Sequence, residues 1–359
     1  MADKGLPLDP FHVYRPTGLA QKGSDPAVSV APILRGECDD VGGRQHELGT
    51  RSGEVTAIVS AEGHGVVKLE PSSHVLLVSM NIVARSALPR AKALDALSQG
   101  LRSTRSGVDL NAAGYVSDFN QNLLAGVIPE DFEADLRQGS GRELDGKFRA
   151  AHSSSALAVN SFGPFRRHAS DLAIGDRHDL SIVGFEQKCP VGLRRGTPPN
   201  LDLVLEGPDQ IIGVESKCTE YLSVHAADFS RAYSEQIVDA RRESGWFAEM
   251  QRLSEAPDDY RWLDAAQLIK HAFGLSHTYP DKPVQLLYLY WEPPNAHEFP
   301  VFGQHRSEVA RFADRVAGSS PSFAAMSYSE LWNGWASAGP PAWLMQHLAR
   351  LEARYSLPI

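Results

Sequence analysis

Three charged residues interrupt two apolar stretches of the chain, which a short polar turn separates. Asp202 lies within LDLVLEG, while Glu215 and Lys217 lie one residue apart within QIIGVESKC. Successive side chains of a β-strand point to opposite faces, so Glu215 and Lys217 would share one face of a strand. If the two stretches pair as a hairpin, Asp202 comes near Glu215. The sequence therefore predicts two neighbouring carboxylates with an ammonium group beside them.

Two neighbouring carboxylates repel each other, and one of them binds a proton unless a cation compensates their charge. A divalent metal is the natural compensator, because Mg²⁺ is held by a few carboxylate oxygens together with water and substrate phosphate. Lys217 beside such a metal could hold the attacking water or stabilise charge on phosphorus. This arrangement favours phosphodiester chemistry. The alternative interpretation is a structural ion pair between Glu215 and Lys217 on a solvated face of a sheet.

The surrounding sequence predicts the elements that would position these residues. Apolar residues at helical spacing predict one long helix over 140–162, and a strand over 179–190 ends at a proline. A Gly-Pro-Asp turn joins the two charged strands. The further elements that we expect are helices over 228–254 and 260–275, a strand over 284–293 and a closing helix over 341–355. Their order predicts an α/β fold with helices packed on a mixed sheet.

The segment PNLDLVLEG…IIGVESK resembles the PD-(D/E)xK motif of the restriction-endonuclease-like nuclease superfamily. Asp202 matches the motif aspartate, although it lies three residues after Pro199 rather than directly after a proline. Glu215-Ser216-Lys217 matches the (D/E)xK part, and only this triplet follows a turn and an acid-bearing strand. The resemblance implies a core of a helix, a three-stranded meander, a helix and a strand, with a mixed central sheet and extra helices around it. The expected elements over 140–293 follow that order.

The resemblance also implies roles for individual residues. The ligands of Mg²⁺ or Mn²⁺ would be Asp202, Glu215 and the backbone carbonyl of Ser216. Lys217 would position or activate water. Many members of the superfamily add an acidic residue on the first helix, for which Glu143 is the first candidate and Asp145 the second. A further triplet at Glu186 and Lys188 is interpreted either as a substrate-facing feature or as a solvated strand end.

The distribution of charge bears on the partner. A net charge of −9 counts against a protein that coats nucleic acid, because phosphate binding needs a positive surface. Residues 141–200 nevertheless hold nine Lys and Arg against six Asp and Glu. The candidates for binding the substrate backbone are Arg166, Arg167, Arg194, Arg195 and Gln236. The expected partner is nucleic acid, DNA rather than RNA, and a homodimer is left open.

Composition and the distribution of apolar residues predict the cellular compartment and the domain boundaries. Three cysteines without a CxxC pair indicate a reducing cytoplasm, and the longest apolar run, 75–84, is shorter than the about 20 residues that span a bilayer. We expect an N-terminal segment over 1–79 that is loosely folded, short helices over 80–135, the nuclease-like core over 136–335 and a C-terminal helix over 336–359. Met80 opens a more regular stretch and is an alternative start.

Other functions are weighed against the metal-dependent nuclease. His152 beside serines lacks a GxSxG elbow, and neither HExxH nor a GxxxxGK[ST] loop is present. A catalytically silent member of the same fold, acting as a binding module, is the first alternative, because fold does not fix function. A Mg²⁺-dependent phosphoesterase that cleaves small substrates is the second.

Overall fold

The structure, a computed structural model, describes residues 74–138, 143–194, 197–237 and 239–359. The chain divides into two compact units, and the described residues from Val83 onward belong to one of them. Of the other unit, Tyr14–Ile82, only the first residues of helix α1 (His74–Thr104) are described. The expectations for residues 1–73 and for Arg195 lie outside the described residues.

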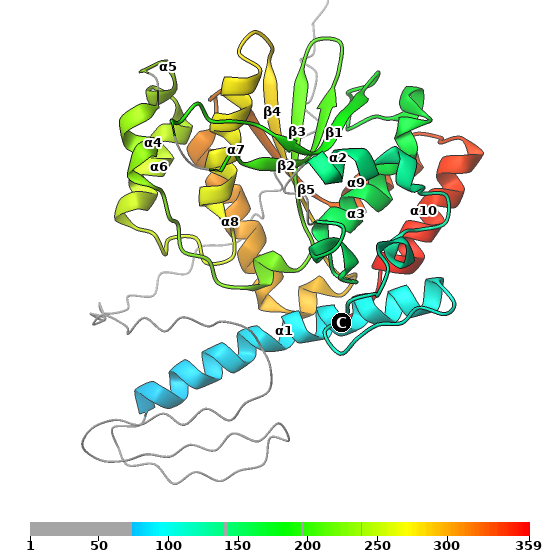
Figure 1. Cartoon of the computed structure of the whole chain (residues 1–359). Helices are drawn as coiled ribbons and strands as arrows, with labels where there is room; N and C mark the ends of the chain where they lie inside the picture. The colour runs from blue at the N-terminus through cyan, green and yellow to red at the C-terminus, as the bar shows by residue number, and fades with distance from the viewer. Residues whose placement is uncertain (1–73, 139–142, 195–196, 238) are drawn as a thin grey trace, which may run out of the picture. The chain divides into compact units, whose positions relative to one another are not determined.

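A mixed sheet of five strands forms the centre of the unit that begins at Val83 (Figure 1). Its strands, in spatial order, are β1 (Ser181–Lys188), β2 (Asn200–Glu206), β3 (Ile211–Lys217), β4 (Val284–Tyr290) and β5 (Ser322–Ser327). The pairs β1–β2 and β2–β3 are antiparallel, whereas β3–β4 and β4–β5 are parallel. Strand β4 is buried along its whole length, as its apolar sequence predicts for an interior strand. The expected α/β class with a mixed central sheet is confirmed.

Helices flank the sheet (Figure 1). After α1 they are α2 (Glu133–Gln138), α3 (Ser154–Phe162), α4 (Arg231–Gln236), α5 (Asp239–Arg242), α6 (Gly245–Glu255), α7 (Ala265–Thr278), α8 (Pro300–Val316), α9 (Tyr328–Ser337) and α10 (Ala342–Tyr355). Ser216 on β3 donates a hydrogen bond to the backbone oxygen of Ser154 on α3, at 3.1 Å. Its neighbour Glu215 lies 2.9 Å from His271 on α7. Because adjacent residues of a strand point to opposite faces, α3 and α7 cover opposite faces of β3.

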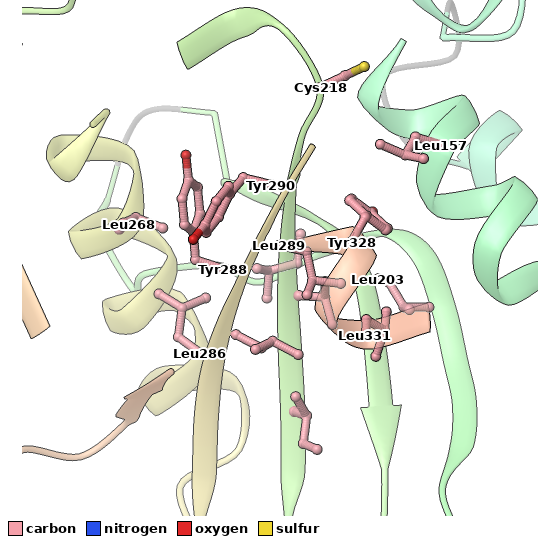
Figure 2. Close-up of a cluster of buried hydrophobic side chains, with 14 of the residues drawn as sticks. Leu157, Leu203, Cys218, Leu268, Leu286, Tyr288, Leu289, Tyr290, Tyr328 and Leu331 are labelled. Atoms are coloured by element: carbon pink, nitrogen blue, oxygen red, sulfur yellow. The ribbon is translucent and has the colours of Figure 1, made fainter. Parts of the chain in front are cut away.

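One hydrophobic cluster joins these layers. Figure 2 shows part of it, where Leu157 of α3, Leu203 of β2 and Leu289 of β4 lie with Tyr328 and Leu331 of α9. All of these side chains are at most 3% exposed. Burying apolar side chains of this size contributes roughly 1.5–3 kcal/mol each, so the sheet and its helices are held together mainly by this core.

The single long helix expected over 140–162 is wrong. Residues 143–146 form a turn, Lys147–Arg149 form a 3₁₀ turn, and α3 begins only at Ser154. The hydroxyl of Ser153 caps α3 by accepting from the backbone N–H of Ala156 at 3.1 Å. The apolar positions that suggested a continuous helix, such as Phe148, are indeed buried. Phe148 is buried from the 3₁₀ turn, and the helix begins later because a serine in an extended conformation starts a helix rather than continuing one.

Other boundaries also differ from expectation. The stretch over 80–135 begins not as short helices but within the continuous helix α1, which contains Pro89. The helix expected over 260–275 begins at Ala265, where the side chain of Asp264 caps it. Strand β5 and helices α8 and α9 were not predicted from the sequence. The strands expected at 179–190 and 284–293 and the closing helix at 341–355 are confirmed within a few residues.

Helix α7 approaches the end of β1 very closely. A Cβ atom added to Gly274 would lie 2.3 Å from the backbone oxygen of Cys189 and 3.1 Å from its Cβ. A backbone oxygen cannot move aside as a flexible side chain can, so only glycine allows this approach. The same helix carries Gln267 and His271, so its position against β1 determines where those two side chains lie.

We expect Gly274→Ala to lower the free energy of unfolding by about 1–3 kcal/mol, because overpacking outweighs the gain of about 1 kcal/mol in helix propensity. Gly334→Ala on α9 is the matched control, since nothing lies within 4 Å of the added Cβ. The control should raise the free energy of unfolding by up to about 1 kcal/mol. Urea denaturation measures both changes. Equal stabilisation by the two substitutions would show that α7 does not need this contact.

Candidate active site

A cavity of about 380 Å³ opens where the first residues of β2 meet the last residues of β3. Besides the strands, the turn before α3, the loop after α1 and helix α7 contribute to its wall. The carboxylates that line it are Glu143, Glu186, Asp202, Glu215 and Glu220. The cationic side chains are Arg90, Lys147 and Lys217. Carboxylates thus outnumber cations five to three, an excess equal to the charge of one divalent cation.

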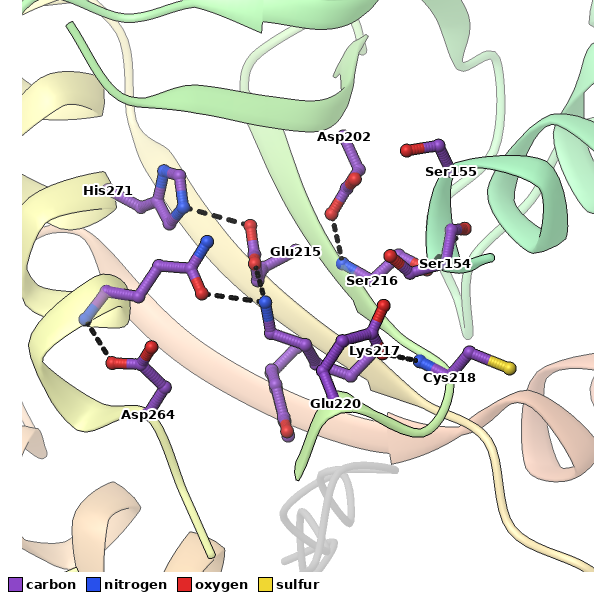
Figure 3. Close-up of polar contacts among 12 residues, drawn as sticks. Ser154, Ser155, Asp202, Glu215, Ser216, Lys217, Cys218, Glu220, Asp264 and His271 are labelled. Atoms are coloured by element: carbon purple, nitrogen blue, oxygen red, sulfur yellow. Dashed lines mark hydrogen bonds and ion pairs between the residues drawn. The ribbon is translucent and has the colours of Figure 1, made fainter. Parts of the chain in front are cut away.

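The hairpin brings Asp202 and Glu215 together. Strands β2 and β3 pair with Leu203 opposite Val214, so the same register continued by one residue sets Asp202 opposite Glu215. The carboxylate of Asp202 accepts a hydrogen bond from the backbone N–H of Ser216 at 2.7 Å (Figure 3). Burial raises the pKa of Asp202 well above its usual value, and the charges of Glu215 and Glu186 raise it further. These effects favour the protonated form of Asp202, and a bound cation would oppose them.

Glu215 and Lys217 share one face of β3 and form a buried ion pair. The ammonium Nζ of Lys217 lies 2.6 Å from Glu215 Oε1 and donates to Oε1 of Gln267 at 2.7 Å (Figure 3). His271 Nε2 lies 2.9 Å from Glu215 Oε2, close enough for an ion pair, although its N–H is not aligned for a hydrogen bond. Glu215 is only 1% exposed, so this pair does not lie on a solvated sheet face.

The ion pair fixes the protonation of both partners. Burial alone would raise the pKa of Glu215, but the cation of Lys217 and the imidazole of His271 lower it below its usual value. Burial alone would likewise lower the pKa of Lys217, and the carboxylate of Glu215 more than reverses that effect. Glu215 is therefore a carboxylate and Lys217 an ammonium at neutral pH.

A second pair of carboxylates meets at Ser155. The hydroxyl of this residue lies 3.0 Å from Glu143 Oε1 and 3.2 Å from Glu186 Oε1, so one hydroxyl bridges two acids. Burial and the charge of Glu143 raise the pKa of Glu186 to about 7. Glu186 also has a positive φ of 48°, a backbone conformation that is strained for a side chain of its size. Glu143 thus lines the cavity, but from a turn rather than from the expected first helix.

Three of the basic residues expected to contact the substrate backbone, Arg166, Arg167 and Arg194, do not line this cavity. Arg166 donates to the backbone oxygen of Ile182 at 3.0 Å and pairs with Asp135, while Arg167 pairs with Asp131 at 3.0 Å. The backbone N–H of Arg194 donates to the side-chain oxygen of Gln236 at 2.9 Å. Arg195 lies outside the described residues. Contact of any of these residues with a substrate stays a prediction.

Several residues of the site escaped the sequence analysis. His271 lies four residues after Gln267, so the spacing of α7 puts both on the helix face that meets β3. This four-residue spacing is the only local feature of the sequence that could have indicated a role for His271. Glu220 accepts from the backbone N–H groups of Cys218 and Thr219 at 2.7 and 2.9 Å, just beyond the motif lysine. Arg90 and Lys147 reach the cavity from segments that precede the sheet.

Among the residues that the structure describes, no three His, Cys, Asp or Glu side chains converge as a ready-made metal cluster. No helix in this described part of the chain has the length and apolar character needed to cross a membrane.

Comparison with known families adds one finding. A family model described as "Restriction Endonuclease associating with ARP" matches residues 93–356. The match covers most of the chain and includes the whole sheet, Asp202 and the triplet from Glu215 to Lys217. No curated protein and no solved structure matches the chain.

The raised pKa of Glu186 predicts how stability depends on pH. Glutamate has an ordinary pKa of 4.5, and that of Glu186 is about 7 in the folded protein. Between these values the folded state holds the additional proton, so the free energy of unfolding falls as the pH rises. At about 1.4 kcal/mol per pKa unit, the loss reaches about 3 kcal/mol above pH 7.

We therefore expect Glu186→Gln, measured in EDTA, to be more stable than wild type by up to about 3 kcal/mol at pH 8. The difference should shrink to zero as the pH falls through 4.5. Denaturant titrations at several pH values measure it, with the exposed Glu243→Gln as the control that should show no pH-dependent difference. A constant difference across this pH range would mean that Glu186 titrates normally.

Proposed function

The chain belongs to the family of restriction endonucleases associating with ARP, among the restriction-endonuclease-like nucleases, and from this we propose that it is a metal-dependent nuclease that hydrolyses phosphodiester bonds of DNA. One observation carries the proposal. Asp202 and the buried ion pair of Glu215 and Lys217 line one cavity whose carboxylates outnumber its cations. Such a cavity is built to receive a positive ion together with a phosphate.

The residues present fit a divalent metal. Asp202 and Glu215 offer carboxylate oxygens from opposite positions of one hairpin, and the backbone carbonyl of Ser216 would complete the set. Mg²⁺ needs few protein ligands, because water and substrate phosphate supply the others. Desolvation raises the pKa of Asp202, the charges of Glu215 and Glu186 raise it further, and a cation would relieve the effect of those charges. Bound there, the metal would polarise the scissile phosphate and favour deprotonation of the attacking water.

Lys217 acts in this scheme as a fixed cation rather than as a base. Its raised pKa keeps the ammonium group protonated, and Glu215 and Gln267 hold that group at 2.6 and 2.7 Å. An ammonium with two fixed acceptors has one N–H left to donate. That N–H can orient the attacking water or stabilise the charge that develops on the phosphate oxygens.

Glu186 is suited to receive the proton. Hydrolysis forms a bond from the water oxygen to phosphorus and breaks the bond from phosphorus to a sugar oxygen. Water gives up a proton in this step, and the sugar oxygen takes one from solvent. A carboxylate whose pKa is about 7 accepts a proton near neutral pH far better than one of ordinary acidity. Glu143 shares the hydroxyl of Ser155 with Glu186 and would hold it in place.

We expect Asp202→Asn to lower the rate of DNA cleavage in Mg²⁺ by at least about 100-fold, the upper end of what losing an outer metal partner costs. Asn keeps an oxygen that can accept from the backbone N–H of Ser216, so the hairpin should stay intact. Calorimetric titration with Mn²⁺ should show a site in wild type that is lost in Asp202→Asn and in Glu215→Gln.

The matched control is Asp209→Asn in the exposed turn of the same hairpin, which should cleave and bind Mn²⁺ as wild type does. Thermal unfolding checks that each variant is folded. Undiminished cleavage by folded Asp202→Asn would exclude this mechanism. Absence of both Mn²⁺ binding and DNA cleavage in wild type would favour the catalytically silent binding module. Cleavage of small phosphodiesters but not of DNA would favour the phosphoesterase.

A further inference from the structure

Two cationic side chains in the cavity have no partner among the residues that the structure describes. The side chains of Arg90 and Lys147 make no hydrogen bond or ion pair with any residue that the structure describes, and both are exposed. The third cation, Lys217, is by contrast tied to Glu215 and Gln267. Two free cations that share a cavity with several carboxylates, yet pair with none of them, are available to an anionic group from outside.

A histidine beside them has an unused nitrogen. Nδ1 of His152 is buried and has no hydrogen-bond partner among the described residues, although the ring lines the cavity. Tyr115 packs edge-on against this ring, with 6.0 Å between the ring centroids. Burial lowers the pKa of His152, and Arg90 lowers it further, against the opposing charge of Glu220. The imidazole is therefore neutral at pH 7, with one nitrogen donating and the other accepting.

These residues come from a different part of the chain than the motif. Arg90 lies on α1, Tyr115 in the loop after it, Lys147 in a 3₁₀ turn and His152 just before α3. All of them precede β1, whereas Asp202 and Glu215 come from the β2–β3 hairpin. The hairpin thus gives the cavity Asp202, Glu215 and Lys217, whereas the preceding segments give it Glu143 together with two cations and a histidine.

We propose that Arg90, Lys147 and His152 form a subsite for the backbone phosphates of DNA next to the phosphate that is cleaved. The proposal rests on the nuclease function proposed above. Arginine presents a planar fork of donors that matches phosphate oxygens, and lysine adds a point charge. His152 contributes one neutral hydrogen bond. Glu220, whose charge raises the pKa of His152, is already held by two backbone N–H groups.

The subsite is tested by DNA binding rather than by cleavage. Binding of a labelled short duplex DNA is measured by fluorescence anisotropy in Ca²⁺. This ion neutralises the carboxylates but accepts looser coordination than Mg²⁺. The recovered DNA is then checked for intact length. The full-length protein is compared with Arg90→Gln, Lys147→Gln and the double variant. Each lost phosphate contact should weaken binding and reduce the slope of log K against log salt by about 0.9.

His152→Ala gives a different signature from the two charge variants. A neutral contact releases no counterion, so binding should weaken while the salt slope stays unchanged. Arg102→Gln is the matched control, because this arginine is exposed on the same helix as Arg90 and does not line the cavity. It should leave both affinity and slope unchanged. Thermal unfolding confirms that each variant keeps its fold.

The outcomes separate the subsite from the nuclease function. Wild-type affinity and slope in folded Arg90→Gln and Lys147→Gln would overturn the subsite, and so would a wild-type protein that binds no DNA. A change in slope confined to these variants, in a protein that cleaves no DNA in Mg²⁺, would support the subsite and reject the nuclease. If Arg102→Gln lost as much DNA affinity and salt slope as the cavity variants, the effect would come from the net charge of the protein, and the proposal would be overturned.

Discussion

The ion pair between Glu215 and Lys217, 2.6 Å apart and shielded from water, is the interaction around which the candidate site is arranged. An unpaired charge in such surroundings costs several kcal/mol, so neither residue is stable there alone. Gln267 and His271 complete the pair, and both belong to α7. Helix α7 must therefore lie where it does, and the close approach of Gly274 to Cys189 allows it.

Around this pair the cavity holds more negative charge than its own cations balance. Asp202 and Glu186 respond by gaining affinity for protons, because both are partly shielded from water and lie near other carboxylates. Glu186 adds a strained backbone conformation. Carboxylates close to one another and a strained backbone lower the stability of a fold, and they persist where a bound ligand offsets that loss of stability. A cation bound at Asp202 and Glu215 would offset part of the negative charge that adds to desolvation in raising these pKa values, so metal binding and stability should be coupled.

The cavity also joins two parts of the chain with different properties. The hairpin supplies acids, whereas the segments before the sheet supply Arg90, Lys147 and His152. The family match spans residues 93–356, and Arg90 lies just before it on the same helix as matched residues. Arg166 and Arg167, by contrast, hold Asp135 and Asp131. Their contacts stabilise the packing of the segment around α2 against β1, a structural role for two of the basic residues near the motif.

The sequence by itself determined the local part of this protein. The β2–β3 hairpin, the shared face of Glu215 and Lys217 and the proximity of Asp202 follow from strand alternation and a short turn, which act over a few residues. Only the tertiary structure decided the rest. The bridge at Ser155, the contact of His271 with Glu215 and the free cations from earlier segments join residues distant in sequence. The packing of helices on the sheet creates such contacts, and periodicity indicates which face is buried but not which residue it meets.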